Sequence, residues 1–158
     1  MDMNNGGLME MHNSNSKTYL VTGGEGFIGR KLVDKLLTQG HKIIVIDNNI
    51  TSYEREEITN VKVIQECVST AKITDNLDGI FHLASVAAPR LFNEQIFNVI
   101  LPNVTGTMNM ISHAQENCCR LLYASSSEVY GESGNISQQK MIENGFGYHK
   151  LLSEKSVY

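Results

Sequence analysis

Hydrophobic residues in this chain form short runs that alternate with amphipathic stretches. The runs occupy residues 19–21, 42–46, 61–64, 79–84 and 120–124. Short apolar runs bounded by glycine or polar residues are typical of buried strands, and strands that alternate with helical patterns favour parallel pairing. The pattern therefore predicts an α/β fold with a doubly wound parallel sheet, a Rossmann-like arrangement.

The amphipathic stretches predict the helices. Residues 28–37 place their apolar side chains on one helical face, directly after the first predicted strand. A second helical pattern covers residues 93–117, where Pro102 must either start a new helix or kink a longer one. A further helix is predicted over residues 146–158, after a polar loop at 132–145.

Length and composition set the broad class of protein. The 158 residues suffice for one domain with a real core, and 41% hydrophobic with 19% charged residues is usual for a soluble globular protein. The net charge of -4 gives no basic surface, so we expect neither a nucleic acid nor a membrane as a partner. Residues 1–16 lack periodicity and are predicted to be a disordered leader, which leaves 17–158 as the domain.

The cysteines and one histidine carry no predicted metal chemistry. Cys67, Cys118 and Cys119 lack the spacing of a metal site, so no metal is expected. Their odd number suits a reducing compartment, and we expect a cytoplasmic protein. The adjacent Cys118 and Cys119 are interpreted as small apolar filler, and His82 as a packed core histidine rather than a ligand.

Three glycines connect the first predicted strand to the first predicted helix. Gly23, Gly26 and Gly29 are spaced three residues apart. Glycine permits a left-handed backbone in a tight turn and lets a pyrophosphate approach without meeting a Cβ, while the helix start offers unpaired N–H groups. The alternative is a strand-to-helix corner that needs glycine for packing alone.

A carboxylate ends the second predicted strand. Asp47 follows Gly29 by eighteen residues, which suits a group that accepts hydrogen bonds from the adenosine ribose of a dinucleotide. No arginine directly follows Asp47 to receive a 2′-phosphate, so NAD is favoured over NADP. Asn48 could contact the adenosine, although loop solvation is the simpler interpretation, and the stretch 66–68 would lie near an adenine.

One candidate residue follows each of the five predicted strands. These residues are Gly23, Asp47, Cys67, Ser85 and Ser126. Because the carboxyl ends of parallel strands meet at one edge of a sheet, and ligands of such sheets bind beyond that edge, we expect these residues to surround one site.

Taken together, five motifs resemble the extended short-chain dehydrogenase/reductases, and within them the NAD-dependent sugar-nucleotide epimerases, dehydratases and decarboxylases. In chain order the motifs are Thr22–Gly29, Asp47, His82–Ser85, Asn103–Thr107 and Ser125–Gly131. The likeness covers about residues 18–158. Among the branches, the motifs look most like those of UDP-glucuronate decarboxylases, and the dehydratase and 4-epimerase branches are similar.

The resemblance implies a cofactor, a substrate and a set of site residues. NAD would be held tightly, a UDP-sugar would be oxidised at C4 and then decarboxylated, epimerised or dehydrated, and the enzyme would be a homodimer. The implied catalytic residues are Ser126, Glu128, Lys150 and the residue at position 146. The implied cofactor contacts are Gly23, Gly26, Phe27, Ile28, Gly29, Asp47, Asn48, Cys67, Val68, Leu83, Ala84, Ser85, Asn103 and Lys150. Residues 125–127 could instead merely cap a loop at the end of a strand.

The chain departs from the family pattern at three points. Phe146 stands four residues before Lys150, where the family has the tyrosine that acts as the base. Cys67 stands where an aspartate is usual, and the later strands and substrate domain of the family are expected to be absent. Two hypotheses stay open: an impaired nucleotide-sugar enzyme, or a non-catalytic NAD-binding sensor or partner subunit. An insertion that shifts the alignment around Phe146 is a further alternative.

Overall fold

The computed structural model describes residues 15–50, 58–86 and 96–130, together with Lys150, Ser153 and Val157. The side chain of Ile96 lies outside this set. Most of the predicted leader, the predicted loop at 132–145 and Phe146 also lie outside the described residues.

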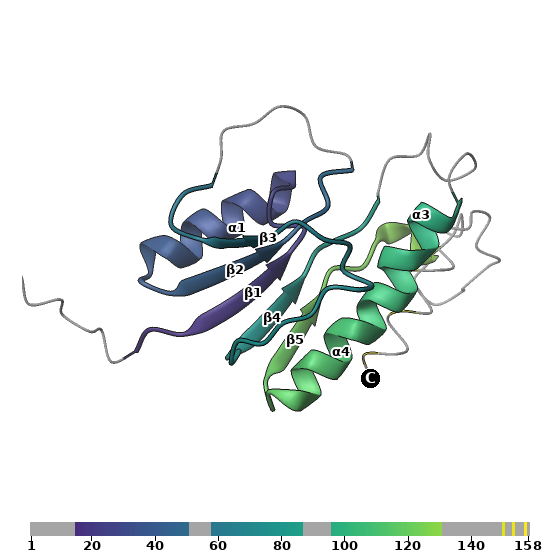
Figure 1. Ribbon diagram of the computed structural model, residues 1–158. Helices are drawn as coiled ribbons and strands as arrows, with labels where there is room; N and C mark the ends of the chain where they lie inside the picture. Colours follow the sequence, from purple (N-terminus) through teal and green to yellow (C-terminus); the bar gives the residue numbers. More distant parts are fainter. Residues whose placement is uncertain are drawn as a thin grey trace, which may run out of the picture.

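Five strands form one parallel sheet (Figure 1). They are β1 (Thr18–Thr22), β2 (Lys42–Ile46), β3 (Lys62–Ile64), β4 (Gly79–His82) and β5 (Arg120–Tyr123). Their spatial order is β3-β2-β1-β4-β5, so the chain moves outward from β1 in one direction and then crosses to the other side. The predicted doubly wound parallel sheet is confirmed, with strand ends within one or two residues of the predicted runs.

Helices cover the two faces of the sheet. Helix α1 (Phe27–Thr38) lies on one face, and α4 (Gly106–Glu116) lies on the other (Figure 1). Helix α4 continues from α3 (Ile96–Ile100) through η1 (Leu101–Thr105), a π-helical segment that contains Pro102. The predicted interruption at Pro102 is therefore confirmed, and it takes the form of a widened turn rather than a clean break. After β5, a short 3-10 helix, η2, covers Ser127–Tyr130.

Two hydrophobic clusters hold these layers together, because alternate strand residues point to opposite faces. On the α1 side, Val21, Val45 and Val33 are completely buried. On the α4 side, Leu20 and Met110 are completely buried. Cys119 also packs against the α4-side cluster, as predicted, but Cys118 is exposed with a φ of 50°, so its interpretation as filler is wrong. Cys118 ends the helix in the left-handed conformation that terminates many helices.

The strands end level with one another at their carboxyl ends. Thr22, at the end of β1, pairs with Ile46 on one side and with His82 on the other. The same row continues outward to Ile64 and Tyr123. Every connection that follows a strand therefore starts at the same edge of the sheet, and the candidate site lies there.

Candidate functional site

The turn after β1 depends on two glycines for different reasons. Gly23 has a φ of 69°, and a Cβ there would lie 2.9 Å from the backbone nitrogen of Ala84. Gly29 is buried in α1, and its Cβ would lie 2.1 Å from the carbonyl oxygen of Gly23. The first glycine satisfies a left-handed backbone, and the second lets the helix pack directly on the turn.

The start of α1 offers backbone donors. Gly26 is the N-cap residue, and no side chain caps the helix. The N–H of Arg30 donates to the carbonyl oxygen of Gly26 at 3.0 Å, which is the first bond of the helix. The preceding N–H groups of the first turn have no intrahelical acceptor and can bind an anion. Because the side chains of Phe27 and Ile28 are 81% and 67% exposed, any contribution these residues make to such a site comes from their backbone.

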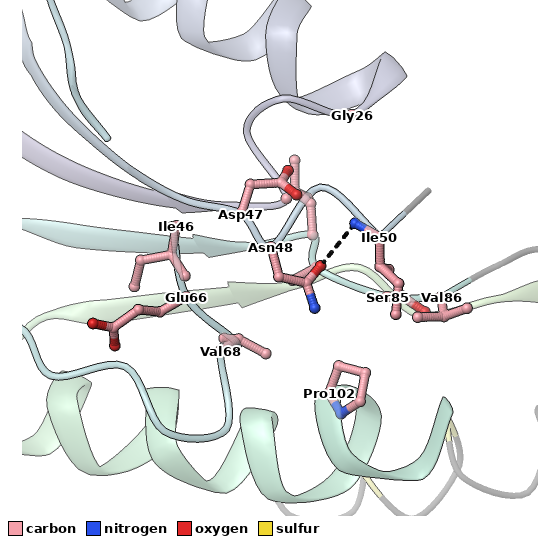
Figure 2. A pocket seen from close by; sticks show the side chains of 13 residues that line it. Gly26, Ile46, Asp47, Asn48, Ile50, Glu66, Val68, Ser85, Val86 and Pro102 are labelled. Atoms are coloured by element: carbon pink, nitrogen blue, oxygen red, sulfur yellow. Dashed lines mark hydrogen bonds between the residues drawn. The ribbon is translucent and has the colours of Figure 1, made fainter. Parts of the chain in front are cut away.

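Asp47 is held in a fixed orientation beside this turn. Its Oδ2 accepts a hydrogen bond from the N–H of Glu25 at 3.1 Å, and its Oδ1 accepts one from the N–H of Asn49 at 2.9 Å. A carboxylate oxygen can accept more than one hydrogen bond, so both retain capacity for hydroxyl donors. Next to it, Asn48 accepts a hydrogen bond from the N–H of Ile50 at 3.3 Å (Figure 2).

A pocket joins these groups at the edge where the strands end. Figure 2 shows Asp47 and Asn48 on one side of it and Pro102, from η1, on the other. Of the residues predicted at the site, the lining contains Gly23, Gly26, Asp47, Asn48, Glu66, Val68, Leu83, Ala84 and Ser85. Cys67 does not line it, and its Sγ lies 3.0 Å from Ser69 Oγ. Ile46, Ile50, Val86 and Pro102 also line it and were missed by the sequence reasoning.

The missed lining residues carry only weak sequence signals. Ile46, Ile50 and Val86 are apolar residues at or after strand ends, where a pocket wall and a core look alike in sequence. Pro102 carried a signal that was assigned only to helix geometry. Pro102 lines the same pocket as Glu66 and Val68, which follow β3, so the proline of η1 completes the wall.

His82 connects β1, β4 and α4 beneath the pocket. Its Nδ1 lies 2.7 Å from Thr22 Oγ1, and its Nε2 lies 3.0 Å from Thr107 Oγ1. Thr22 Oγ1 accepts hydrogen bonds from the backbone N–H groups of Leu83 and Ala84, each at 3.1 Å. The hydroxyl proton of Thr22 is therefore donated to Nδ1 of His82. Thr107 donates its proton to the carbonyl oxygen of Asn103 at 2.7 Å and therefore accepts from His82.

These partners fix His82 as the neutral tautomer with its proton on Nε2. Its side chain is 1% exposed, which confirms the prediction of a packed core histidine. Burial, and secondarily the charge of Lys150, lowers its pKa to about 3. His82 therefore stays uncharged at neutral pH and positions the backbone of Leu83 and Ala84, which line the pocket.

Asn103 lies behind the pocket and joins several segments. Its Oδ1 accepts a hydrogen bond from Ser85 Oγ at 2.7 Å, and its Nδ2 donates to the carbonyl oxygen of Val99 at 2.8 Å. Its own carbonyl oxygen also accepts a hydrogen bond from Ser153 Oγ. Because Asn103 is completely buried, it acts through Ser85 and does not line the pocket.

Three of the predicted catalytic residues, Ser126, Glu128 and Lys150, are described and follow β5 in the chain. Lys150 is 3% exposed, and its Nζ donates to the carbonyl oxygen of Ala124 at 3.0 Å. Ser126 Oγ accepts the N–H of Glu128 at 3.2 Å, which leaves its hydroxyl proton to be donated elsewhere. Glu128 is exposed. The structure thus brings Lys150 to the end of β5, while position 146 is outside the described residues.

Two general features of the described residues bear on the class of site. They contain no group of three or more histidine, cysteine, aspartate or glutamate side chains that could hold a metal ion. None of the helices in this part of the chain has the length and apolar character needed to cross a membrane.

Relatives with known names share this sequence pattern. The chain is 35% identical over 152 residues to "UDP-glucuronic acid decarboxylase 1" of Danio rerio, an alignment that covers 90% of this chain and 34% of that protein. It is 32% identical over 123 residues to "UDP-N-acetyl-alpha-D-glucosaminuronate decarboxylase" of Bacillus cytotoxicus, covering 73% and 38%. The chain thus spans about a third of the length of the curated relatives it matches.

A solved structure and the sequence model of a protein family also match this chain. The structure of MoeE5 in complex with UDP-glucose and NAD matches with a TM-score of 0.75 and 26% identity, covering 89% of this chain and 48% of that one. The sequence model of the NAD dependent epimerase/dehydratase family matches residues 19–158. The glycine turn, Asp47 and the motif His82–Ser85 all lie within the matched residues. The chain belongs to the NAD-dependent epimerase/dehydratase family.

Proposed function

We propose that this chain forms the NAD-binding part of an enzyme that modifies a UDP-uronic acid by decarboxylation. The observation that carries the proposal is the level row of strand ends, which places the glycine turn, Asp47, Ser85 and the Lys150 ammonium along one edge. The two named decarboxylases among the relatives differ in sugar, but both names specify a UDP-uronate. A carboxylate at C5 is the shared chemistry that supports this substrate class.

The residues at this edge fit NAD. The start of α1 has no side-chain cap, so its backbone N–H groups can bind a pyrophosphate. Gly26 lines the pocket and has no Cβ, which lets the pyrophosphate approach the backbone. Asp47 suits the ribose hydroxyls and would repel the 2′-phosphate of NADP. When bound, NAD would accept a hydride from C4 of the sugar and later return it.

The remaining roles belong to side chains of the chain. The Ser126 hydroxyl can donate a hydrogen bond to the sugar oxygen that loses its proton, and the Lys150 ammonium stabilises negative charge near the end of β5. Glu128 is exposed, and its carboxylate can accept a hydrogen bond from a substrate hydroxyl. Phe146 has no proton to transfer, so we propose that oxidation at C4 is impaired in this chain.

A second candidate function rests on the same residue. Phenylalanine at position 146 favours a protein that binds NAD without turnover, as a sensor or as the partner subunit of an active enzyme. The intact glycine turn and Asp47 serve both functions. Lys150 and Ser126 favour the enzyme, because a protein that only binds the cofactor has little need of them.

We also propose that the chain associates as a homodimer. Phe97 on α3, Leu101 on η1 and Met108 on α4 are 74%, 43% and 59% exposed. Three large apolar side chains on successive helical segments form an exposed apolar face, which is a common feature of protein–protein interfaces. We call Phe97, Leu101 and Met108 the apolar face.

The proposed enzyme can be tested by restoring the missing base. This chain would be joined to the part of the Danio rerio decarboxylase that follows the matched region, with and without Phe146→Tyr. Calorimetry with NAD and NADP establishes cofactor binding first. The tyrosine variant should then turn over UDP-glucuronate about 10²–10⁴ times faster, because a positioned acid/base group contributes that much to a rate. The gain should appear in kcat rather than in KM.

Two results would contradict the proposal. If the tyrosine variant binds NAD and UDP-glucuronate but releases no carbon dioxide and never reduces the cofactor, position 146 is not the base. If Lys150→Met leaves the restored rate unchanged, Lys150 has no part in the reaction. The Phe146→Leu chimera serves as the matched control, because it changes the side chain without supplying a proton.

A further inference from the structure

Two groups at the carboxyl end of β5 lie next to the ammonium of the buried Lys150. One is the carbonyl oxygen of Ala124, 3.0 Å from Nζ. The other is the ring of Tyr123, whose centroid lies 4.8 Å from Nζ with the ammonium over its face. Because Lys150 as a whole is only 3% exposed, its ammonium needs compensating groups, and a π-face can supply part of this compensation.

The ring of Tyr123 is itself held in place. Tyr123 pairs with His82 in the β4–β5 register, and the two ring centroids lie 5.6 Å apart at an interplanar angle of 42°. Both ring nitrogens of His82 are hydrogen-bonded, to Thr22 and Thr107. The imidazole cannot rotate without breaking these bonds, so it supports the tyrosine ring on one side.

We propose that Tyr123 is a positioning residue, whose π-face holds the Lys150 ammonium at the carboxyl end of β5. Because the ring carries no net charge, it stabilises the ammonium without neutralising it. This contact therefore leaves the positive charge able to act on a neighbouring hydroxyl or ribose, whereas a carboxylate in place of the ring would cancel most of that charge. The contact between Tyr123 and Lys150 does not depend on the proposed function. Only the role of Lys150 in binding the cofactor rests on that proposal.

The surrounding charges agree with this arrangement. The charge of Lys150 contributes to the lowered pKa of His82, so the two groups are close enough to interact. Among the described residues of β4, His82 is the titratable side chain that contacts the Tyr123 ring, and it stays neutral above pH 6. The Tyr123 phenol, which could also titrate at alkaline pH, is absent from every variant of the series described below. Titration of Lys150 at alkaline pH is therefore not confounded by a second change of charge on that strand.

The test varies the electron density of the ring while its size stays nearly constant, with the unsubstituted phenylalanine variant as the reference. Position 123 of the 158-residue chain would carry phenylalanine and then phenylalanines with one, two and three fluorine atoms, which progressively weaken the π-face. The pKa of Lys150 would be followed by NMR of carbon-labelled lysine, assigned with Lys150→Arg. We expect this pKa to fall stepwise, by about one unit in total. NAD affinity, measured by calorimetry, should fall in parallel.

Phe81 provides the matched control. It lies on β4, one residue before His82, and packs against Tyr19 with ring centroids 5.6 Å apart. The same fluorinated series at Phe81 should leave Lys150 unchanged. A flat response at position 123, or an equal response at position 81, would overturn the proposal. A stepwise fall in the pKa with unchanged NAD affinity would support the contact and count against a role of Lys150 at the cofactor.

Discussion

At the scale of single residues, the three glycines of the turn are not equivalent. A Cβ at Gly29 would lie 2.1 Å from the carbonyl oxygen of Gly23, inside the contact between helix and turn. A Cβ at Gly26 would meet only Gly23, at 3.1 Å, and Gly26 lines the pocket. The interpretation of the glycines as packing residues therefore holds for Gly29, whereas Gly26 is the one that a ligand would approach.

Two alanine substitutions should separate packing from binding. Gly29→Ala should lower the free energy of unfolding by several kcal/mol, because backbone rather than a flexible side chain is in the way. Gly26→Ala should leave the thermal transition within a few degrees of the parent and weaken NAD binding at least tenfold. Circular dichroism and calorimetry measure the two effects. A Gly26→Ala protein that folds and binds NAD normally would exclude the pyrophosphate role.

At the scale of the elements, His82 makes the contact between β1, β4 and α4 depend on pH. The folded state lowers the pKa of His82 to about 3, from an ordinary value of 6.5. As the pH falls below about 6.5, His82 therefore becomes protonated in the unfolded chain but stays neutral in the folded chain. The stability from this group is complete above pH 6.5 and is lost as the pH falls from there toward 3, at most by about 1.4 kcal/mol per pH unit.

Urea unfolding at pH 7, 6 and 5 should show this loss. His82→Gln should reduce the slope of stability against pH, since it removes the titrating group. Nitrogen NMR of the parent protein offers a second readout that does not depend on the variant. The His82 ring should show the Nε2–H tautomer and no titration between pH 7 and 5. Protonation of His82 near pH 6 in the folded protein would refute the assignment.

At the scale of the whole molecule, the apolar face should govern association. Met108→Glu places a charge in the first turn of α4, where it would be buried at a dimer interface without a partner. We expect the parent to sediment as a dimer and this variant as a monomer with an unchanged helical spectrum. Lys31→Glu, at an exposed position of α1 on the opposite face of the sheet, is the control and should stay dimeric. A monomeric parent would reject the proposed homodimer.

The sequence predicted the sheet well because its signals are local. The run 42–46 coincides with β2, and the glycine turn and Asp47 follow β1 and β2 as expected. The remaining features depend on neighbours far along the chain. The bonds of His82 to Thr22 and Thr107 span 60 and 25 residues, and nothing local distinguishes Tyr123 from an ordinary strand aromatic. The exposure of Cys118 likewise follows from the left-handed end of α4, which the apolar pattern does not reveal.

The level row of strand ends also determines how readily the pocket can be redesigned. Asn48, Ile50 and Glu66 line the pocket, are exposed, and belong to neither hydrophobic cluster. Each stands on a connection rather than in a strand, so a combinatorial library at these three positions leaves both cores and all strand pairing untouched. Selection for a different dinucleotide could therefore sample many variants without first having to recover a folded scaffold.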